Sequence, residues 1–170
     1  MAKIIDSLVE YILAGRQVLL PAHVVQKGKS HLLDSLAAVV SGSTLKPGKL
    51  GLQHAREQGG REECSALGTN FKTTPIMAAF ANGMSGHADE TDDSNSQLHP
   101  GCAIVPAALA LAESQDRGGE ALLRAVILGT TSAFASIRLL RRDPRHLARR
   151  SVVPPLPAHW LPWTPCRCVI

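Results

Sequence analysis

Apolar side chains recur at helical spacing in five stretches of the chain, and glycine or proline residues stand at most of the boundaries. Two stretches open at or next to a proline, which suits the first turn of a helix because its missing N–H needs no partner there. Three end at a glycine, a residue common just past a helix. The pattern predicts helices at 4–15, 21–42, 74–86, about 102–114 and about 120–140.

In each predicted helix, the larger apolar side chains define the face expected to point inward. These residues are Val25, Leu32, Leu36 and Val39 in the second helix, Ile76, Met77, Phe80, Ala81 and Met84 in the third, and Leu123, Val126, Ile127, Phe134 and Ile137 in the last. The stretch 102–114 is apolar on nearly every side, so we expect it to be the central buried helix.

The remaining segments have weaker patterns. Residues 46–48 are expected to form a loop, 49–58 a short polar helix, and 64–71 a turn-rich, partly extended segment. Because helical periodicity dominates, the predicted fold class is all-α, a helical bundle over residues 1–150.

Composition agrees with a globular helical domain. Hydrophobic residues make up 45% of the chain and aromatic residues only 4%, so small aliphatic side chains must form the core. Four irregularly spaced cysteines resemble neither a zinc site nor a disulfide framework. No apolar run approaches the roughly 20 residues of a membrane span, and acidic residues stand where a signal peptide would be apolar. We therefore expect a cytoplasmic protein without membrane contact.

The net charge of +4 arises from an arginine run at 138–150, which holds six arginines and one aspartate. Such a run can bind nucleic acid, but it lacks interleaved aromatic residues, so no nucleic-acid partner is expected. A solvated helix end is the commoner explanation. A non-catalytic interaction module, whose arginine run binds an acidic partner, stays open as an alternative.

The candidate chemistry lies in the polar stretch 87–101. It places four carboxylates between two histidines, in the order His87, Asp89, Glu90, Asp92, Asp93, His99. A calcium loop starting at Asp89 would need glycine at Ser94 and glutamate at Pro100, so that motif fails. A solvated acidic turn before a helix needs no function. A general acid–base site is the third interpretation, because crowded carboxylates and an imidazole can exchange protons near neutral pH. Spacing alone does not choose between the last two.

Four segments together resemble the MmgE/PrpD family, which includes 2-methylcitrate dehydratase, cis-aconitate decarboxylase and an iminodisuccinate epimerase. They are Ala79–Gly83, the acidic stretch His87–Ser94, the His-Pro-Gly at 99–101, and Val105–Glu113. The resemblance covers about residues 4–150. It implies an all-helical N-terminal domain, a homodimer, and a lyase that dehydrates or decarboxylates small di- or tricarboxylates without metal or cofactor. An epimerase that shares the proton abstraction is the alternative within the family.

Carried over position by position, the resemblance implies that the catalytic residues are Glu90, Asp92, Asp93, Ser94 and His99. Glu90 stands where the family usually has aspartate, and Ser94 replaces the usual threonine but keeps its hydroxyl. His87 is interpreted as a helix-end residue rather than a catalyst.

The resemblance ends near residue 150. Residues 151–170 hold five of the eleven prolines, both tryptophans and no acidic residue, so we expect a disordered tail or sequence foreign to the fold. The family continues into a second domain whose basic residues hold the substrate carboxylates. The expectation is therefore a truncated or frameshifted product, inactive by itself.

Overall fold

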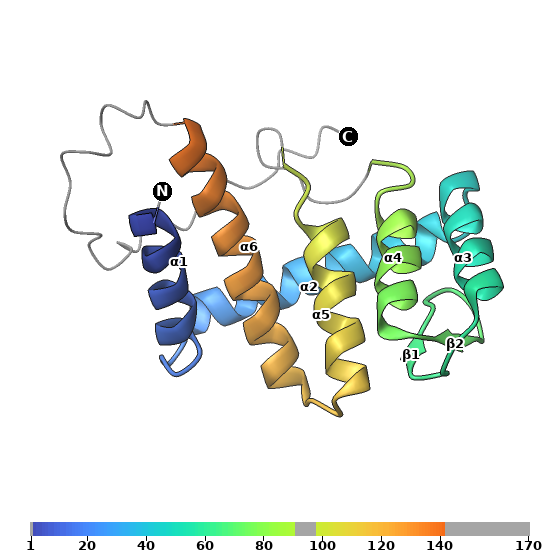
Figure 1. The fold of residues 1–170 in the computed structure, drawn as a ribbon, viewed down its shortest axis with the longest axis horizontal. Coiled ribbons are helices and arrows are strands. Elements are labelled where there is room, and N and C mark those ends of the chain that lie inside the picture. Colours follow the sequence, from blue (N-terminus) through green and yellow to red (C-terminus); the bar gives the residue numbers. More distant parts are fainter. Residues whose placement is uncertain (1, 91–97, 142–170) are drawn as a thin grey trace. The chain divides into compact units, whose positions relative to one another are not determined.

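The computed structural model describes residues 2–90 and 98–141, and the chain falls into two compact units. The larger unit runs from Leu19 to Thr130, and the described part of the smaller unit comprises residues 2–18 and 131–141. The elements are α1 (Ala2–Gly15), α2 (Ala22–Gly42), α3 (Lys46–Gln58), β1 (Cys64–Ser65), β2 (Lys72–Thr73), α4 (Pro75–Gly86), α5 (Gly101–Ser114) and α6 (Gly119–Arg141) (Figure 1). The predicted all-α class is confirmed, with one short two-stranded sheet in addition.

Local signals account for the helix starts. The Thr74 hydroxyl accepts a hydrogen bond from the N–H of Met77, and Pro75 is the first residue of α4, as the sequence predicts. The loop predicted at 46–48 is wrong, because α3 already begins at Lys46. Pro47 lies in the first turn, where a proline interrupts no helical hydrogen bond.

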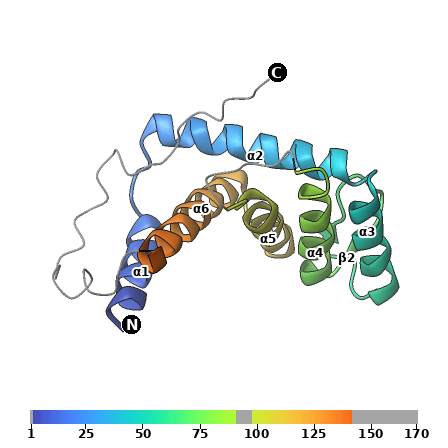
Figure 2. The same cartoon turned by 90° about the horizontal axis from the view of Figure 1, so that it is seen from above.

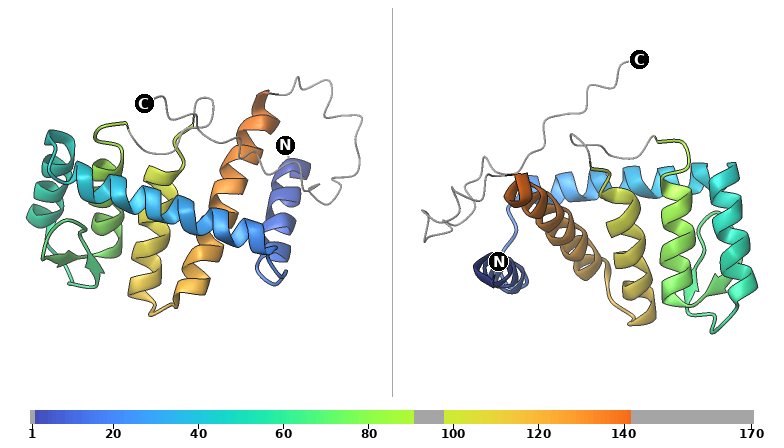
Figure 3. Two further views of the ribbon diagram at one scale, coloured as in Figure 1. Left: turned by 180° about the vertical axis from the view of Figure 1, so that it is seen from behind. Right: turned by 45° about the horizontal axis from the view of Figure 1, so that its top comes forward.

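Within the larger unit, α3, α4 and α5 lie side by side, and α2 crosses one side of this row (Figures 2 and 3). Glycines lie where two helices approach each other most closely. A β-carbon at Gly28 of α2 would lie 2.7 Å from the Ile127 side chain of α6, and one at Gly129 of α6 would lie 2.8 Å from Ile104 of α5. The first half of α6 therefore packs against both α2 and α5.

The buried face of α2 is displaced from the predicted one, and it is built from smaller side chains. Its buried residues are Val24, Gly28, His31, Ser35, Ala38, Val39 and Gly42. Of the four residues predicted to point inward, Val39 is buried, whereas Val25, Leu32 and Leu36 are only half-buried. Small side chains let neighbouring helices approach closely, and the larger ones are placed at the edge of the contact.

In α4, too, the buried face differs from the predicted one and is built from small side chains. Its buried residues are Ala78, Ala81, Asn82, Ser85 and Gly86. Ile76 and Phe80, which were predicted to point inward, are 75% and 43% exposed. The predicted inward face of α4 is therefore right at Ala81, partly right at Met77, which is half-buried against the core, and wrong at Ile76, Phe80 and Met84.

The prediction of a central helix buried all round is wrong for α5, whereas α6 follows its prediction at Val126. In α5, Val105, Pro106 and Ala110 are buried, but Leu111 is 55% exposed, so the described residues cover this helix on one side rather than all round. In α6, Val126 is completely buried as predicted. The side chain of Ile137 lies outside the described part.

The antiparallel pair of β1 and β2 is fastened to α4 and α5 by hydrogen bonds to two side chains. Ser65 donates from its N–H and its hydroxyl to the Glu113 carboxylate, at 2.8 and 2.6 Å. The Asn82 amide donates to the Ser65 carbonyl at 3.0 Å and accepts from the N–H of Leu67 at 2.8 Å. Asn82 is 1% exposed, so these bonds replace the water that its amide would otherwise contact.

Residues 142–170 lie outside the described part of the chain. The predicted tail at 151–170, most of the arginine run and the domain boundary at 150 therefore stay predictions. Among the described helices, none combines the length and the apolar character that a membrane span needs.

Candidate functional site

The candidate site is built where the end of α4 approaches the start of α5. A β-carbon at Gly83 would lie 2.9 Å from the Cys102 carbonyl oxygen, and one at Gly86 would lie 3.1 Å from the Val39 side chain of α2. A β-carbon at Gly83 would require the backbone of α5 to move, and one at Gly86 would require the Val39 side chain to shift slightly. The polar stretch between α4 and α5 therefore begins and ends on tightly packed helix termini.

The two histidines that flank this stretch in the sequence are neighbours in space. His87 follows α4 as its C-cap residue, is exposed, and donates its backbone N–H to the Gly83 carbonyl at 3.2 Å. His99 precedes α5 and is half-buried. The two imidazole centroids lie 5.0 Å apart with the ring planes tilted by 57°. This contact joins the two ends of the segment 88–98.

The backbone of His99 is restrained from its C-terminal side. Pro100, the N-cap residue of α5, limits the conformations open to the residue before it. The thiol of Cys102, in the first turn of α5, donates to the His99 carbonyl at 3.1 Å. Both restraints act on the main chain of His99. Its side-chain torsions are determined by contacts with the surrounding groups.

Glu90 has an unusual backbone conformation. Its φ angle is +57°, in the left-handed region that side chains other than glycine, asparagine and aspartate rarely adopt. Its side chain is exposed, as is that of Asp89. Such strain tends to concentrate at functional sites, where the surrounding structure maintains it.

Of the five catalytic residues implied by the resemblance, the structure describes Glu90 and His99. Asp92, Asp93 and Ser94 lie outside the described residues, so their joint placement with His99 stays a prediction. The structure adds one residue that sequence reasoning had set aside. His87 is the expected helix-end residue, but its ring also contacts that of His99. The sequence feature that could have indicated this contact is that the two histidines flank the acidic stretch on either side.

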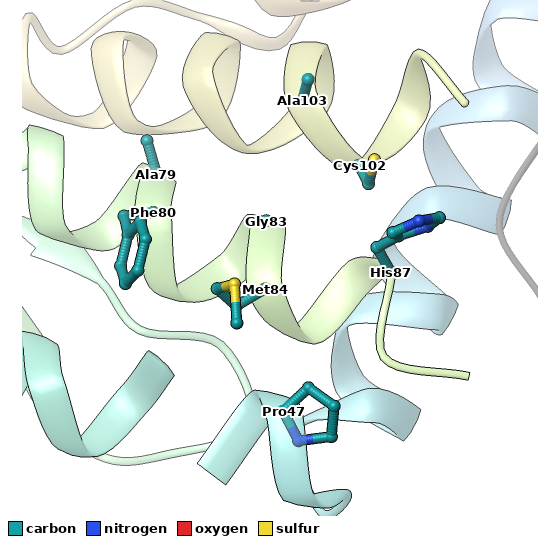
Figure 4. Close-up of a pocket in the computed structure, with 8 residues that line it drawn as sticks. All are labelled: Pro47, Ala79, Phe80, Gly83, Met84, His87, Cys102 and Ala103. Carbon is teal, nitrogen blue, oxygen red and sulfur yellow. The ribbon is translucent and has the colours of Figure 1, made fainter. Parts of the chain in front are cut away.

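A pocket of about 450 Å³ opens beside this region, between α3, α4 and α5 (Figure 4). Its lining is mostly apolar and comprises Pro47, Ala79, Phe80, Gly83, Met84, His87, Cys102 and Ala103. His87 and Cys102 stand at the end of the pocket where α4 finishes and α5 starts. The pocket thus borders the candidate site through His87, while its walls offer little that would hold a carboxylate.

No group of three or more histidine, cysteine, aspartate or glutamate side chains could hold a metal ion within residues 2–90 and 98–141. The carboxylates at 92 and 93 lie outside that range. Within it, the groups suited to proton transfer beside the α4–α5 junction are the two imidazoles and the exposed carboxylates of Asp89 and Glu90.

Residues 6–139 match the family model described as the MmgE/PrpD N-terminal domain. The chain is 34% identical over 128 residues to a cis-aconitate decarboxylase-like protein of Aspergillus oryzae, a match that covers 74% of this chain and 26% of the relative. It is 30% identical over 96 residues to the cis-aconitate decarboxylase of Homo sapiens, covering 55% of this chain and 20% of the relative. The chain thus spans about a quarter or less of the length of the curated relatives it matches.

Proposed function

The chain belongs to the MmgE/PrpD family, and on that premise we propose that it supplies the N-terminal half of the active site of a lyase for small di- or tricarboxylates. The reaction is the removal of a proton next to a carboxylate, followed by departure of water or carbon dioxide. In this proposal proton transfer by side chains carries the chemistry, and no metal ion or cofactor takes part.

The observation that carries the proposal is the position of His99. It stands half-buried at the base of the acidic stretch, with its backbone restrained by Pro100 and Cys102 and its ring against that of His87. An imidazole held in place can accept a proton from a carbon acid or return one. The exposed Glu90, with its positive φ, belongs to the run of carboxylates that would share this work.

In this proposal His99 and a carboxylate of the acidic stretch divide the acid and base roles. Asp92 and Asp93 are the proposed partners, and the Ser94 hydroxyl orients the substrate. The groups that bind the substrate carboxylates are proposed to lie in the remaining three quarters of a full-length family member, so the 170-residue chain alone is expected to show no turnover.

Two further parts of the proposal concern the setting of the reaction. A cytoplasmic, reducing compartment is proposed from the sequence, because the four irregularly spaced cysteines resemble no disulfide framework. The exposed apolar side chains of Ile76, Phe80 and Met84 on α4 favour association of two copies, as the family resemblance implies.

The test is made in a full-length enzyme that carries this domain. His99→Ala should lower kcat by about 10²–10⁴ while leaving the helical content unchanged, because one proton-transfer partner is lost. His54→Ala is the control, since His54 is an exposed residue of α3 whose ring contacts Phe80 instead. Wild-type turnover by His99→Ala would overturn the proposal, and epimerised product without release of water or carbon dioxide would replace the lyase with an epimerase.

A further inference from the structure

We propose that the pocket between α3, α4 and α5 binds an apolar chain carried by the substrate, so that the enzyme acts on carboxylates with an alkyl substituent of several carbons. The inference rests on the proposed function, because the pocket takes one part of the molecule from which His99 removes a proton. It adds a second binding region to the candidate site and narrows the class of substrate.

The lining of the pocket is suited to a hydrocarbon. Of the eight described residues around it, six have an apolar side chain or none, and the other two are His87 and Cys102. None of the eight carries a carboxylate, an ammonium or a guanidinium group. A charged group deep in such a pocket would lose water without gaining a partner, whereas an alkyl chain gains free energy when it leaves water. The described walls therefore favour an apolar ligand.

The polarity of the lining changes along the pocket. Phe80, Met84 and His87 are spaced four and three residues apart, so they share one face of α4 and its C-terminal end. At the rise of an α-helix, Phe80 and His87 lie roughly 10 Å apart along the axis. His87 and Cys102 stand together at one end of the pocket, and Ala79 and Phe80 stand at the other (Figure 4). A ligand with a polar head and an alkyl tail matches this arrangement.

The polar end of the pocket adjoins the residue proposed to transfer the proton. His87 lines the pocket, and its ring centroid lies 5.0 Å from that of His99. A substituent near the reacting carbon would therefore enter the pocket by passing beside the His87 ring. A methyl group extends only about 1.5 Å, the length of one carbon–carbon bond, and would stop short of the apolar end. A chain of several carbons is needed to use the pocket.

The size and exposure of the pocket set the expected gain in affinity. Its volume of about 450 Å³ falls within the range of roughly 300–1,000 Å³ that is usual for ligand pockets. Full burial of one methylene group raises an affinity about threefold to fourfold. Two of the walls are themselves open to solvent, since Phe80 is 43% and Met84 37% exposed, so the chain is only partly removed from water. We therefore expect a gain of about twofold to threefold for each methylene.

The first experiment uses the 170-residue chain and requires no activity. Succinate, butylsuccinate and hexylsuccinate are added while the methyl signals of Ala79, Met84 and Ala103 are followed by NMR. The alkylated probes should shift these signals where succinate does not, and hexylsuccinate should act at about fourfold to ninefold lower concentration than butylsuccinate. The methyl group of Ala107, exposed one turn further along α5, is the control and should not shift. Equal shifts with all three probes, or no shifts at the lining residues, would overturn the inference.

The second experiment measures the Kd of the same probes by calorimetry in a full-length enzyme that carries this domain. Met84→Lys should weaken the binding of hexylsuccinate by about fivefold to tenfold and leave that of succinate unchanged, because only the chain contacts the altered wall. Ile76→Lys is the matched control. Ile76 is exposed on the same helix and belongs to the same row of apolar side chains as Met84, but it does not line the pocket.

The outcomes separate this inference from its alternatives. If Ile76→Lys weakens hexylsuccinate binding as much as Met84→Lys, the effect arises from association of two copies over α4, and the assignment of the pocket is wrong. A wild-type Kd that does not fall with chain length would also overturn it. If His99→Ala keeps wild-type turnover, the proposed function fails instead, and the dependence of Kd on chain length still decides whether the pocket binds an alkyl chain.

Discussion

At the scale of the residue, Cys64 shows how burial controls a reactive group. Its side chain is completely buried in β1, and its thiol donates to the Ala110 carbonyl at 3.1 Å. Burial raises the pKa of this thiol, and the carboxylates of Glu113 and Glu63 act in the same direction. The thiol is therefore a packing group, and its thiolate, the nucleophilic form, is suppressed.

The raised pKa of the Cys64 thiol predicts that the free energy of unfolding falls at alkaline pH. The unfolded chain ionises its thiol near the ordinary value of 9.0, whereas the folded chain keeps the proton to higher pH. Above about pH 9 the unfolded state then binds fewer protons, so the free energy of unfolding falls with a slope of up to about 1.4 kcal/mol per pH unit. Denaturant unfolding between pH 8 and 10 should show a steeper loss in the wild type than in Cys64→Ala. Parallel curves for the two proteins would contradict the prediction.

At the scale of the element, the junction of α4 and α5 depends on glycine. Gly83→Ala places a β-carbon 2.9 Å from a backbone oxygen of α5, which can move only if the helix moves. We expect a destabilisation of about 1–3 kcal/mol, measured by chemical denaturation. Gly119→Ala is the matched control at the start of α6, where nothing lies within 4 Å, and it should be neutral or slightly stabilising. Equal stability of the two variants would mean that the helices are not in close contact at Gly83.

The attachment of the β1–β2 pair gives a second prediction for an element. Glu113→Ala removes the acceptor of two hydrogen bonds from Ser65, and because that acceptor is charged, the expected loss is about 1.5–3 kcal/mol. Glu57→Ala removes one exposed bond from Gln53 within α3 and should change the free energy of unfolding by about 0.2–0.5 kcal/mol. Thermal melts of both variants test the contrast, and a Glu113→Ala melt that matches the wild type would show that the strand pair is held by other contacts.

At the scale of the whole molecule, large apolar side chains remain exposed on α4 within the larger unit. Ile76 is 75% exposed, Phe80 43% and Met84 37%, and they recur at every fourth position along one face of the helix. A contiguous apolar face of this kind is typical of a surface that another protein covers.

We predict that two copies of the chain associate through this face. In light scattering, the wild type should have the mass of a dimer or a larger species, and the double variant Ile76→Lys, Phe80→Glu should shift toward the monomer. Leu33→Lys is the control, because Leu33 is 69% exposed on α2 and does not belong to the row. A wild-type chain that is monomeric at high concentration would contradict the prediction.

Helix positions and family membership could be read from the sequence because their signals are local. The Thr74-Pro75 start of α4 and the glycine at its end act within a few residues, so each helix can be predicted without knowing which helices pack against it. The family-like run from the acidic stretch to His99 is equally visible in the chain. The helix start that was predicted wrongly, near residue 46, involves Pro47, which is compatible with both a loop and a first helical turn.

The tertiary structure decided which faces are buried and which groups meet. Side-chain size suggested that Ile76 and Phe80 point inward, but close approach of helices selected the alanines and glycines instead, because contact distance depends on both partners. The approach of His87 to His99 depends on how α4 packs against α5, and periodicity within either helix carries no information about that distance. The sequence thus determined the elements and the residue types of the candidate site, while packing between elements determined their geometry.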